Sequence, residues 1–204
     1  PAVDILFPDD IGWRKEKVVG EDRKEEKMRI VPLADIWLGH PLCDVSTLKS
    51  RLTWIANEPH VFCFFNGDGI FPVLGVRNDK VAKAQWLNRC GEFYNLFNPI
   101  AHKLLWAQAG CFEDKMFETD YDSLKLYCGK DFWDVPYFRS PFSIGIHWAG
   151  KLFKFYCVHG RSSAQHKGTK ANAMLRGISK IEHHDFIVTS HMRDSISVSP
   201  VRVI

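Results

Sequence analysis

The sequence has no long hydrophobic run and no excess of charge of one sign. No apolar stretch approaches the ~20 residues that a transmembrane helix needs, and the N-terminus, PAVDILFPDD, lacks the basic and then apolar pattern of a signal peptide. We therefore expect a soluble protein with no membrane partner. Because 27 Lys and Arg oppose 24 Asp and Glu, the net charge of +3 does not by itself indicate a nucleic-acid partner.

Closely spaced cysteine pairs are also missing. The six cysteines show no CxxC spacing, and several lie in apolar runs such as VFCFF and FYCV. This pattern is typical of reduced, buried thiols rather than of a disulfide framework. It favours a cytoplasmic protein.

The length and composition indicate a single domain. A chain of 204 residues with 46% hydrophobic content can bury a full core. Near its start, residues 13–27 (WRKEKVVGEDRKEEK) form a dense run of mixed charge, which predicts a solvated helix or loop. We therefore divide the chain into an N-terminal charged extension, residues 1–27, and a domain, residues 28–204.

Within the domain, short apolar runs alternate with segments of helical periodicity, which predicts an α/β fold. The predicted strands are residues 28–33, 61–65, 104–107, 151–158 and 186–189. The predicted helices are residues 45–57, 78–97 and 171–178.

A side chain that can bind metal follows each predicted strand: Asp35, Asp68, Cys111, His159 and His191. Each has an ordinary structural explanation if it is taken alone, such as a helix cap for an aspartate or a core position for the cysteine. However, the carboxyl ends of strands in an α/β sheet meet at one edge, where ligands bind. A mixed set of oxygen, sulfur and imidazole ligands at that edge suits Mn, Fe or Zn.

The segments at the five strand ends, read in order, resemble the motifs of calcineurin-like metallophosphoesterases. They are LADIWLGH (33–40), FNGDGI (65–70), AGCFED (109–114), CVHGRS (157–162) and TSHMRD (189–194). The corresponding family pattern is D-x-H, G-D, G-N-H-[DE], a His often followed by Gly, and G-H-x-H. The resemblance covers residues 28–194 and implies a four-layer αββα sandwich. Residues 195–204 leave little chain for the strands that complete the second sheet.

Four positions depart from the family pattern. Trp37 stands in place of the His of D-x-H, Cys111 and Phe112 replace the Asn-His pair, and Arg193 replaces the last His. The resemblance implies that the first metal site keeps only Asp35 and Asp68, so we expect no ion there.

The second metal site implied by the resemblance keeps Asp68, His159 and His191, with Cys111 in place of Asn. This set is acceptable for one tetrahedral divalent ion, Zn, Mn or Fe; the alternative is that no ion binds. The general acid that the resemblance implies is missing, because its position is Phe112.

These departures predict impaired or absent phosphoester hydrolysis in a protein that is retained as a binding or structural component. The basic segment 161–180, with Arg161, Lys167 and Lys170, is a candidate contact for a phosphoester or nucleic acid, or else an ordinary exposed loop. A protein partner is a further candidate. The alternative function is an active phosphatase or nuclease that uses one ion at the second site. A third interpretation is that the site positions of a competent enzyme were replaced deliberately.

Overall fold

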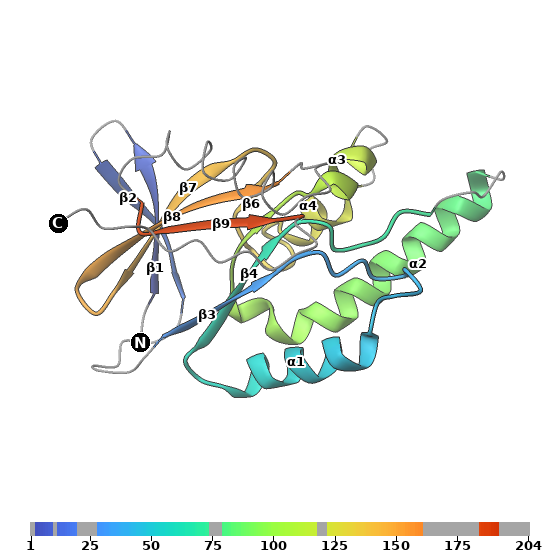
Figure 1. Cartoon of the computed structure of the whole chain (residues 1–204), viewed down its shortest axis with the longest axis horizontal. Coiled ribbons are helices and arrows are strands. Elements are labelled where there is room, and N and C mark those ends of the chain that lie inside the picture. The colour runs from blue at the N-terminus through green and yellow to red at the C-terminus, as the bar shows by residue number, and fades with distance from the viewer. Residues whose placement is uncertain are drawn as a thin grey trace, which may run out of the picture.

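Two β-sheets pack face to face at the centre of the fold, and helices cover the outer face of one of them (Figure 1). The computed structural model describes residues 3–9, 12–19, 28–73, 79–117, 122–160 and 184–191. The four-stranded sheet is parallel, in the order β3 (Arg29–Leu33), β4 (Val61–Asn66), β5 (Leu104–Gln108) and β6 (Tyr137–Phe138). The mixed five-stranded sheet has the order β2 (Gly12–Val19), β1 (Val3–Asp9), β7 (Phe142–Trp148), β8 (Lys151–His159) and β9 (Phe186–Ser190).

Strands β4 and β5 are buried along their whole length, as expected for parallel strands that are covered on both faces. Side chains of one parity, such as Phe64 and Leu105, face the five-stranded sheet and pack against its Ile144 and Ile146. The alternate side chains, such as Phe65, belong to the core beneath the helices. These two cores hold the carboxyl ends of the central strands in place.

The helical layer consists mainly of α1 (Val45–Asn57) and α2 (Asp79–Phe97). Helix α1 begins where the Asp44 carboxylate accepts a hydrogen bond from the Thr47 amide at 2.9 Å, a standard N-cap. The shorter elements are the 3₁₀ helix η1 (Asn98–Lys103), α3 (Cys111–Phe117) and α4 (Ser123–Tyr127). No helix within the described ranges is long and apolar enough to cross a membrane.

The mixed α/β class is confirmed, and all five apolar runs coincide with strands. The first two predicted helices are also confirmed, as α1 and α2. The four-layer sandwich stays a prediction, because residues 171–178 and 195–204, from which its remaining parts would come, lie outside the described residues.

The prediction of helix or loop for residues 13–27 is wrong for its first part, because residues 12–19 form β2. This strand pairs antiparallel with β1, which in turn pairs with β7. β2 is one of the two edge strands of its sheet among the described residues, and charged residues are common on edge strands because they prevent pairing with other chains. Residues 20–27 lie outside the described part of the chain.

Candidate metal centre

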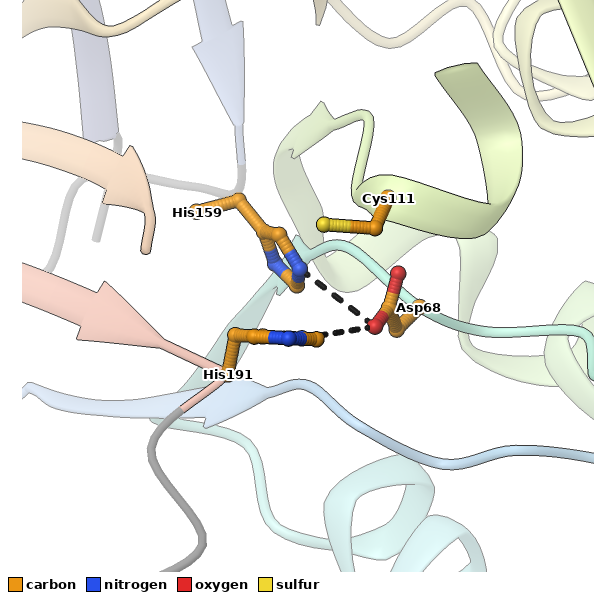
Figure 2. A group of neighbouring side chains, drawn as sticks. All are labelled: Asp68, Cys111, His159 and His191. Atoms are coloured by element: carbon orange, nitrogen blue, oxygen red, sulfur yellow. Dashed lines mark hydrogen bonds and ion pairs between the residues drawn. The ribbon is translucent and has the colours of Figure 1, made fainter. Parts of the chain in front are cut away.

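Four of the five predicted ligands meet at the carboxyl ends of β4, β5, β8 and β9 (Figure 2). They are Asp68, Cys111, His159 and His191, and each offers one ligand atom within 4.8 Å of the others. The cysteine sulfur points toward the His159 ring from the first residue of α3. We call these four residues the ligand cluster.

The backbone is strained after three of the strands that end near the cluster, β3, β4 and β9. Asp35, Trp37, Asp68 and His191 have positive φ angles, between 52° and 62°, and they are four of the six such non-glycine residues in the described part of the chain. This left-handed conformation is unfavourable for residues with a Cβ, and in folded proteins it gathers at functional sites. Here it occurs in the turns that follow β3, β4 and β9.

Two glycines allow these turns to approach one another closely. A Cβ on Gly67, where φ is +86°, would lie 2.5 Å from Nδ1 of His159. A Cβ on Gly110 would lie 2.3 Å from the amide nitrogen of Asp68. Both distances are too short for any side chain, so glycine at both positions is a condition for the cluster to form.

Asp68 is fully buried and lies at the centre of the cluster. Its Oδ2 is 3.0 Å from Nδ1 of His191 and 3.4 Å from Nε2 of His159, while its Oδ1 accepts a hydrogen bond from the Phe112 amide at 2.9 Å. Burial alone would raise the pKa of Asp68, but the interactions with His159, Phe112 and His191 outweigh it and lower the pKa overall. The carboxyl group is therefore ionised at neutral pH.

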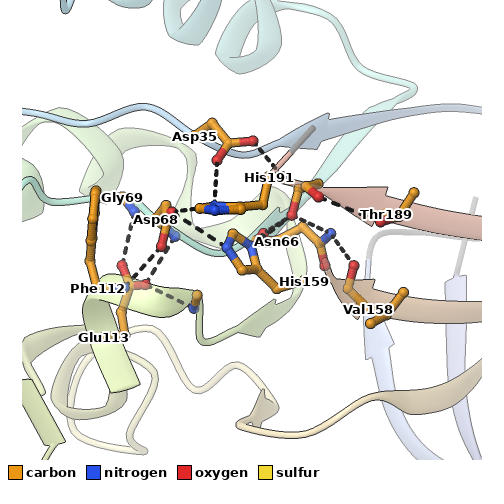
Figure 3. Close-up of polar contacts among 12 residues, drawn as sticks. Asp35, Asn66, Asp68, Gly69, Phe112, Glu113, Val158, His159, Thr189 and His191 are labelled. Atoms are coloured by element: carbon orange, nitrogen blue, oxygen red, sulfur yellow. Dashed lines mark hydrogen bonds and ion pairs between the residues drawn. The ribbon is translucent and has the colours of Figure 1, made fainter. Parts of the chain in front are cut away.

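The surroundings of His159 indicate its tautomer (Figure 3). Its Nδ1 lies 2.8 Å from the carbonyl oxygen of Asn66 and 2.7 Å from Oγ of Ser190. Because a carbonyl oxygen can only accept, we infer that Nδ1 carries the hydrogen. Nε2 then presents a lone pair toward Asp68, which is the arrangement of a metal-binding histidine held by an outer partner.

The lone pair on Nε2 of His159 faces another acceptor. The atom is buried and has no hydrogen-bond partner among the described residues, while Oδ2 of Asp68 faces it at 3.4 Å. Burial lowers the pKa of His159, but the interactions with Asp68 and with the Asn66 carbonyl outweigh it, so the pKa is raised overall. A positive charge between the two atoms, a proton or a metal ion, is therefore favourable.

The ligand cluster fits one tetrahedral ion. Bonds of 2.0–2.3 Å would place tetrahedral ligand atoms roughly 3.3–3.8 Å apart, so the longest separation of 4.8 Å must shorten by roughly 1 Å. One carboxylate, one thiolate and two neutral imidazoles carry two negative charges, which match a divalent ion. The sulfur and nitrogen donors favour Zn or Fe(II) over the harder Mg and Mn.

The fifth predicted ligand, Asp35, is not among the four clustered residues. Its Oδ2 accepts a hydrogen bond from the His191 amide at 2.8 Å, and its Oδ1 lies 3.9 Å from Nδ1 of the same histidine. Asp35 follows β3 and His191 follows β9, so this bond joins the ends of the two sheets. The carboxylate therefore positions a cluster residue through the backbone.

Aromatic rings occupy the positions where the resemblance implies two imidazoles. The ring centroids of Trp37 and Phe112 are 6.1 Å apart, and Phe71 packs 5.4 Å from Phe112 and 4.5 Å from His40. Of these four aromatic side chains, His40 has an imidazole ring, and it is not a member of the ligand cluster. Arg193 and the basic residues Arg161, Lys167 and Lys170 lie outside the described residues.

The sequence analysis did not identify Glu113 as a functional residue, although it fills the [DE] position of the third motif. Its buried carboxylate accepts hydrogen bonds from the amides of Asp68 at 2.9 Å, Gly69 at 2.9 Å and Gly110 at 2.8 Å. Burial raises the pKa of Glu113 to about 7, although the bonds from the Gly69 and Gly110 amides act in the opposite direction. Glu113 fixes the two turns that carry Asp68 and Cys111.

Asn66 and Ser190 were missed as well. The Asn66 side chain donates to the Val158 carbonyl at 3.3 Å and to Oγ of Ser190 at 3.0 Å, and this Oγ donates to the Asn66 carbonyl at 2.6 Å. The only signal in the sequence is that each is a polar residue at the last position of an apolar strand. They link the four-stranded sheet to the five-stranded sheet directly beside His159.

Comparisons with known proteins add no relative. No protein-family model matches the chain, and a search of curated proteins found no match.

Proposed function

We propose that this chain binds one divalent metal ion in a metallophosphoesterase-like domain whose phosphoester hydrolysis is impaired or absent, so that it serves as a binding or structural component. The observation that carries the proposal is the buried pair of Nε2 of His159 and Oδ2 of Asp68, 3.4 Å apart, within the ligand cluster. A metal ion between these two atoms would be bound by both of them, and Cys111 and His191 would complete its coordination. We expect zinc, because of the sulfur ligand.

Impaired hydrolysis follows from what surrounds the ligand cluster. Two-metal hydrolysis uses one ion on each side of the reacting group, and here Trp37, which stands where the first site would have its histidine, packs against Phe71 and Phe112. Phe112, at the position of the general acid, cannot donate a proton. Loss of general acid catalysis alone typically lowers the rate by a factor of ~10²–10⁴.

Zinc titration of protein that has been stripped with a chelator tests the metal site. We expect one equivalent of zinc to bind. Replacing a ligand, as in Cys111→Ala, should weaken zinc binding by more than the roughly 10–100-fold that changes to outer partners cost. Cys43→Ala is the matched control, because Cys43 is likewise a partly exposed cysteine outside any disulfide but lies outside the cluster. Equal zinc affinity of the two variants, or binding well below one equivalent, would contradict the proposal.

An active one-ion phosphoesterase is the second candidate, and Asp35 is the observation that favours it. Its Oδ1 lies 3.9 Å from Nδ1 of His191 and has no hydrogen-bond partner within the described ranges, so it could act as a base if an ion brought a water molecule next to it. A bound ion would lower the pKa of such a water and polarise a phosphoryl oxygen. If zinc-loaded protein hydrolyses bis-p-nitrophenyl phosphate or p-nitrophenyl phosphate and Asp35→Asn abolishes this, the second candidate replaces the first.

Restoring the family pattern tests why hydrolysis is lost. The variant combines four substitutions: Trp37→His, Cys111→Asn, Phe112→His and Arg193→His. We expect it to bind two ions and to hydrolyse p-nitrophenyl phosphate in the presence of Mn²⁺. A folded variant without activity would show that the resemblance does not extend to the chemistry.

A further inference from the structure

Three aromatic side chains, those of Trp37, Phe71 and Phe112, gather beside the ligand cluster. The ring centroid of Trp37 lies 6.4 Å from that of Phe71 and 6.1 Å from that of Phe112, and the rings of Phe71 and Phe112 are 5.4 Å apart. All three residues are only partly buried, so each leaves some of its surface exposed. We call these three side chains the ring cluster.

Backbone hydrogen bonds connect the ring cluster to Asp68, the central residue of the ligand cluster. The Trp37 amide donates to the Asp68 carbonyl at 3.2 Å, and the Phe112 amide donates to Oδ1 of Asp68 at 2.9 Å (Figure 3). Phe112 also follows Cys111 directly in α3. A phosphoester whose phosphate is bound by an ion in the ligand cluster therefore has these rings beside its organic group.

The rings change what the site can bind, in addition to removing catalytic groups. Imidazoles at positions 37 and 112 would present polar nitrogen atoms to a phosphoester, whereas an indole and a phenyl ring present π-faces and apolar edges. Planar aromatic groups make stacked or edge-to-face contacts with such rings. These contacts favour a planar ligand group over a saturated group of the same size.

Two cations border the ring cluster. Nζ of Lys115 lies over the Phe112 ring, 5.9 Å from its centroid, and Nη1 of Arg89 donates to the Phe71 carbonyl at 2.6 Å. Aromatic side chains can also bind quaternary ammonium groups, but the two positive charges disfavour such a ligand. The charges favour an anionic ligand instead, in agreement with a phosphoester.

We propose that the ring cluster binds the planar aromatic group of a phosphoester whose phosphate group is held by the ion in the ligand cluster. The planar group packs on the rings of Trp37, Phe71 and Phe112. A nucleobase and a simple aryl group share this chemistry. The inference names the class of ligand for the metal site, so it rests on the proposed function.

Calorimetric titration of zinc-loaded protein with three phosphonates tests this inference. Phenylphosphonate carries a planar ring, cyclohexylphosphonate carries a saturated ring of similar size, and methylphosphonate carries neither. None of them contains an ester bond, so binding is measured without hydrolysis. We expect phenylphosphonate to bind about two- to twelvefold more tightly than cyclohexylphosphonate, and at least about tenfold more tightly than methylphosphonate.

A second pair of probes distinguishes the two sources of a planar group. AMP and ribose 5-phosphate carry the same phosphate and sugar and differ in the nucleobase. A preference for AMP of about fivefold or more would identify a nucleotide as the ligand. Equal affinities of AMP and ribose 5-phosphate, together with a preference for phenylphosphonate, would identify a simple aryl group.

Two variants remove a ring but keep an apolar side chain: Trp37→Leu and Phe112→Leu. Each should reduce the preference for phenylphosphonate over cyclohexylphosphonate and leave the affinity for methylphosphonate unchanged, which shows that the metal site is intact. The matched controls are Trp54→Leu and Phe132→Leu. Trp54 and Phe132 are 40% and 47% exposed and lie outside the ring cluster, so both controls should keep the preference of the wild type.

Equal affinities for the three phosphonates, or no binding of any of them to protein that contains zinc, would overturn the inference. So would an unchanged preference for phenylphosphonate in both Trp37→Leu and Phe112→Leu. Zinc content is measured separately, so the two conclusions can be distinguished. Protein that binds zinc but does not prefer a planar group contradicts this inference alone, whereas protein that takes up no zinc contradicts the proposed function.

Discussion

Replacing Ser190 with alanine should weaken both the fold and the metal site, because its hydroxyl joins the two sheets beside His159. The side chain is 7% exposed, and its Oγ makes three contacts. It donates to the Asn66 carbonyl at 2.6 Å, accepts from Nδ2 of Asn66 at 3.0 Å, and faces Nδ1 of His159 at 2.7 Å. Ser190→Ala removes all three without creating a large cavity.

The expected loss of stability follows from these contacts. A typical hydrogen bond contributes about 0.5–1.5 kcal/mol net. Each partner keeps a second bond: Nδ2 of Asn66 retains the Val158 carbonyl, and Nδ1 of His159 retains the Asn66 carbonyl. No buried group is left completely unpaired, so we expect the free energy of unfolding to fall by about 1.5–3 kcal/mol. Zinc affinity should fall about 10-fold, since one of two outer partners of a ligand is lost.

Denaturant unfolding of metal-free protein and zinc competition titration measure the two effects. Ser143→Ala is the control, because Ser143 also contacts a histidine, Nε2 of His184 at 2.8 Å, but lies away from the cluster. The control should lose about 1 kcal/mol or less and keep its zinc affinity. If Ser190→Ala loses no more zinc affinity than the control, the hydroxyl does not position His159 and the argument fails.

Two further predictions concern the turns around Asp68. Gly110→Ala should lower the unfolding free energy by about 1–3 kcal/mol and abolish zinc binding, because its Cβ would lie 2.4 Å from Oδ1 of Asp68. Gly91→Ala, within α2 and with open space around it, should instead be stabilising by about 0.5–1 kcal/mol, and the reverse order of unfolding midpoints would refute this. Burial raises the pKa of Glu113 to about 7, above its usual value of 4.5, so the folded state favours its protonated form. Stability of metal-free protein should therefore fall by about 3 kcal/mol as pH rises from 4.5 through 7, and parallel pH profiles of the wild type and Glu113→Gln would contradict it.

The ligand cluster could be predicted from the sequence because its geometry follows from local features. Each ligand comes directly after a short apolar run, and buried parallel strands place such positions at one edge of a sheet. The pairing of Phe65 with Leu33 and with Ala107 in the parallel sheet brings the three following turns together. The positions of these residues at the strand ends were therefore enough to predict that their side chains lie close together.

The residues that hold the cluster could not be predicted, because their contacts run between sheets. Asn66 and Ser190 are 124 residues apart, and although both lie within motif segments, neither stands at a position where the family pattern has a ligand. The charged strand β2 was missed for another reason: backbone pairing defines an edge strand, and its polar sequence resembles that of a solvated loop. The hydrogen bond that Asp35 accepts from the His191 amide could not be predicted either, because the two residues are far apart in the sequence.

Under the proposed function, the contacts of Asp35 and Glu113 would explain how metal binding could be kept while hydrolysis is lost. Both carboxylates hold backbone amides at the strand ends, and these bonds do not depend on the side chains at positions 37 and 112. Rings can therefore occupy those two positions while Asp68 and His191 stay 3.0 Å apart. Substitutions at 37 and 112 should then change the chemistry at the site without unfolding it, whereas removing the Glu113 side chain should disturb both of the turns that carry Asp68 and Cys111.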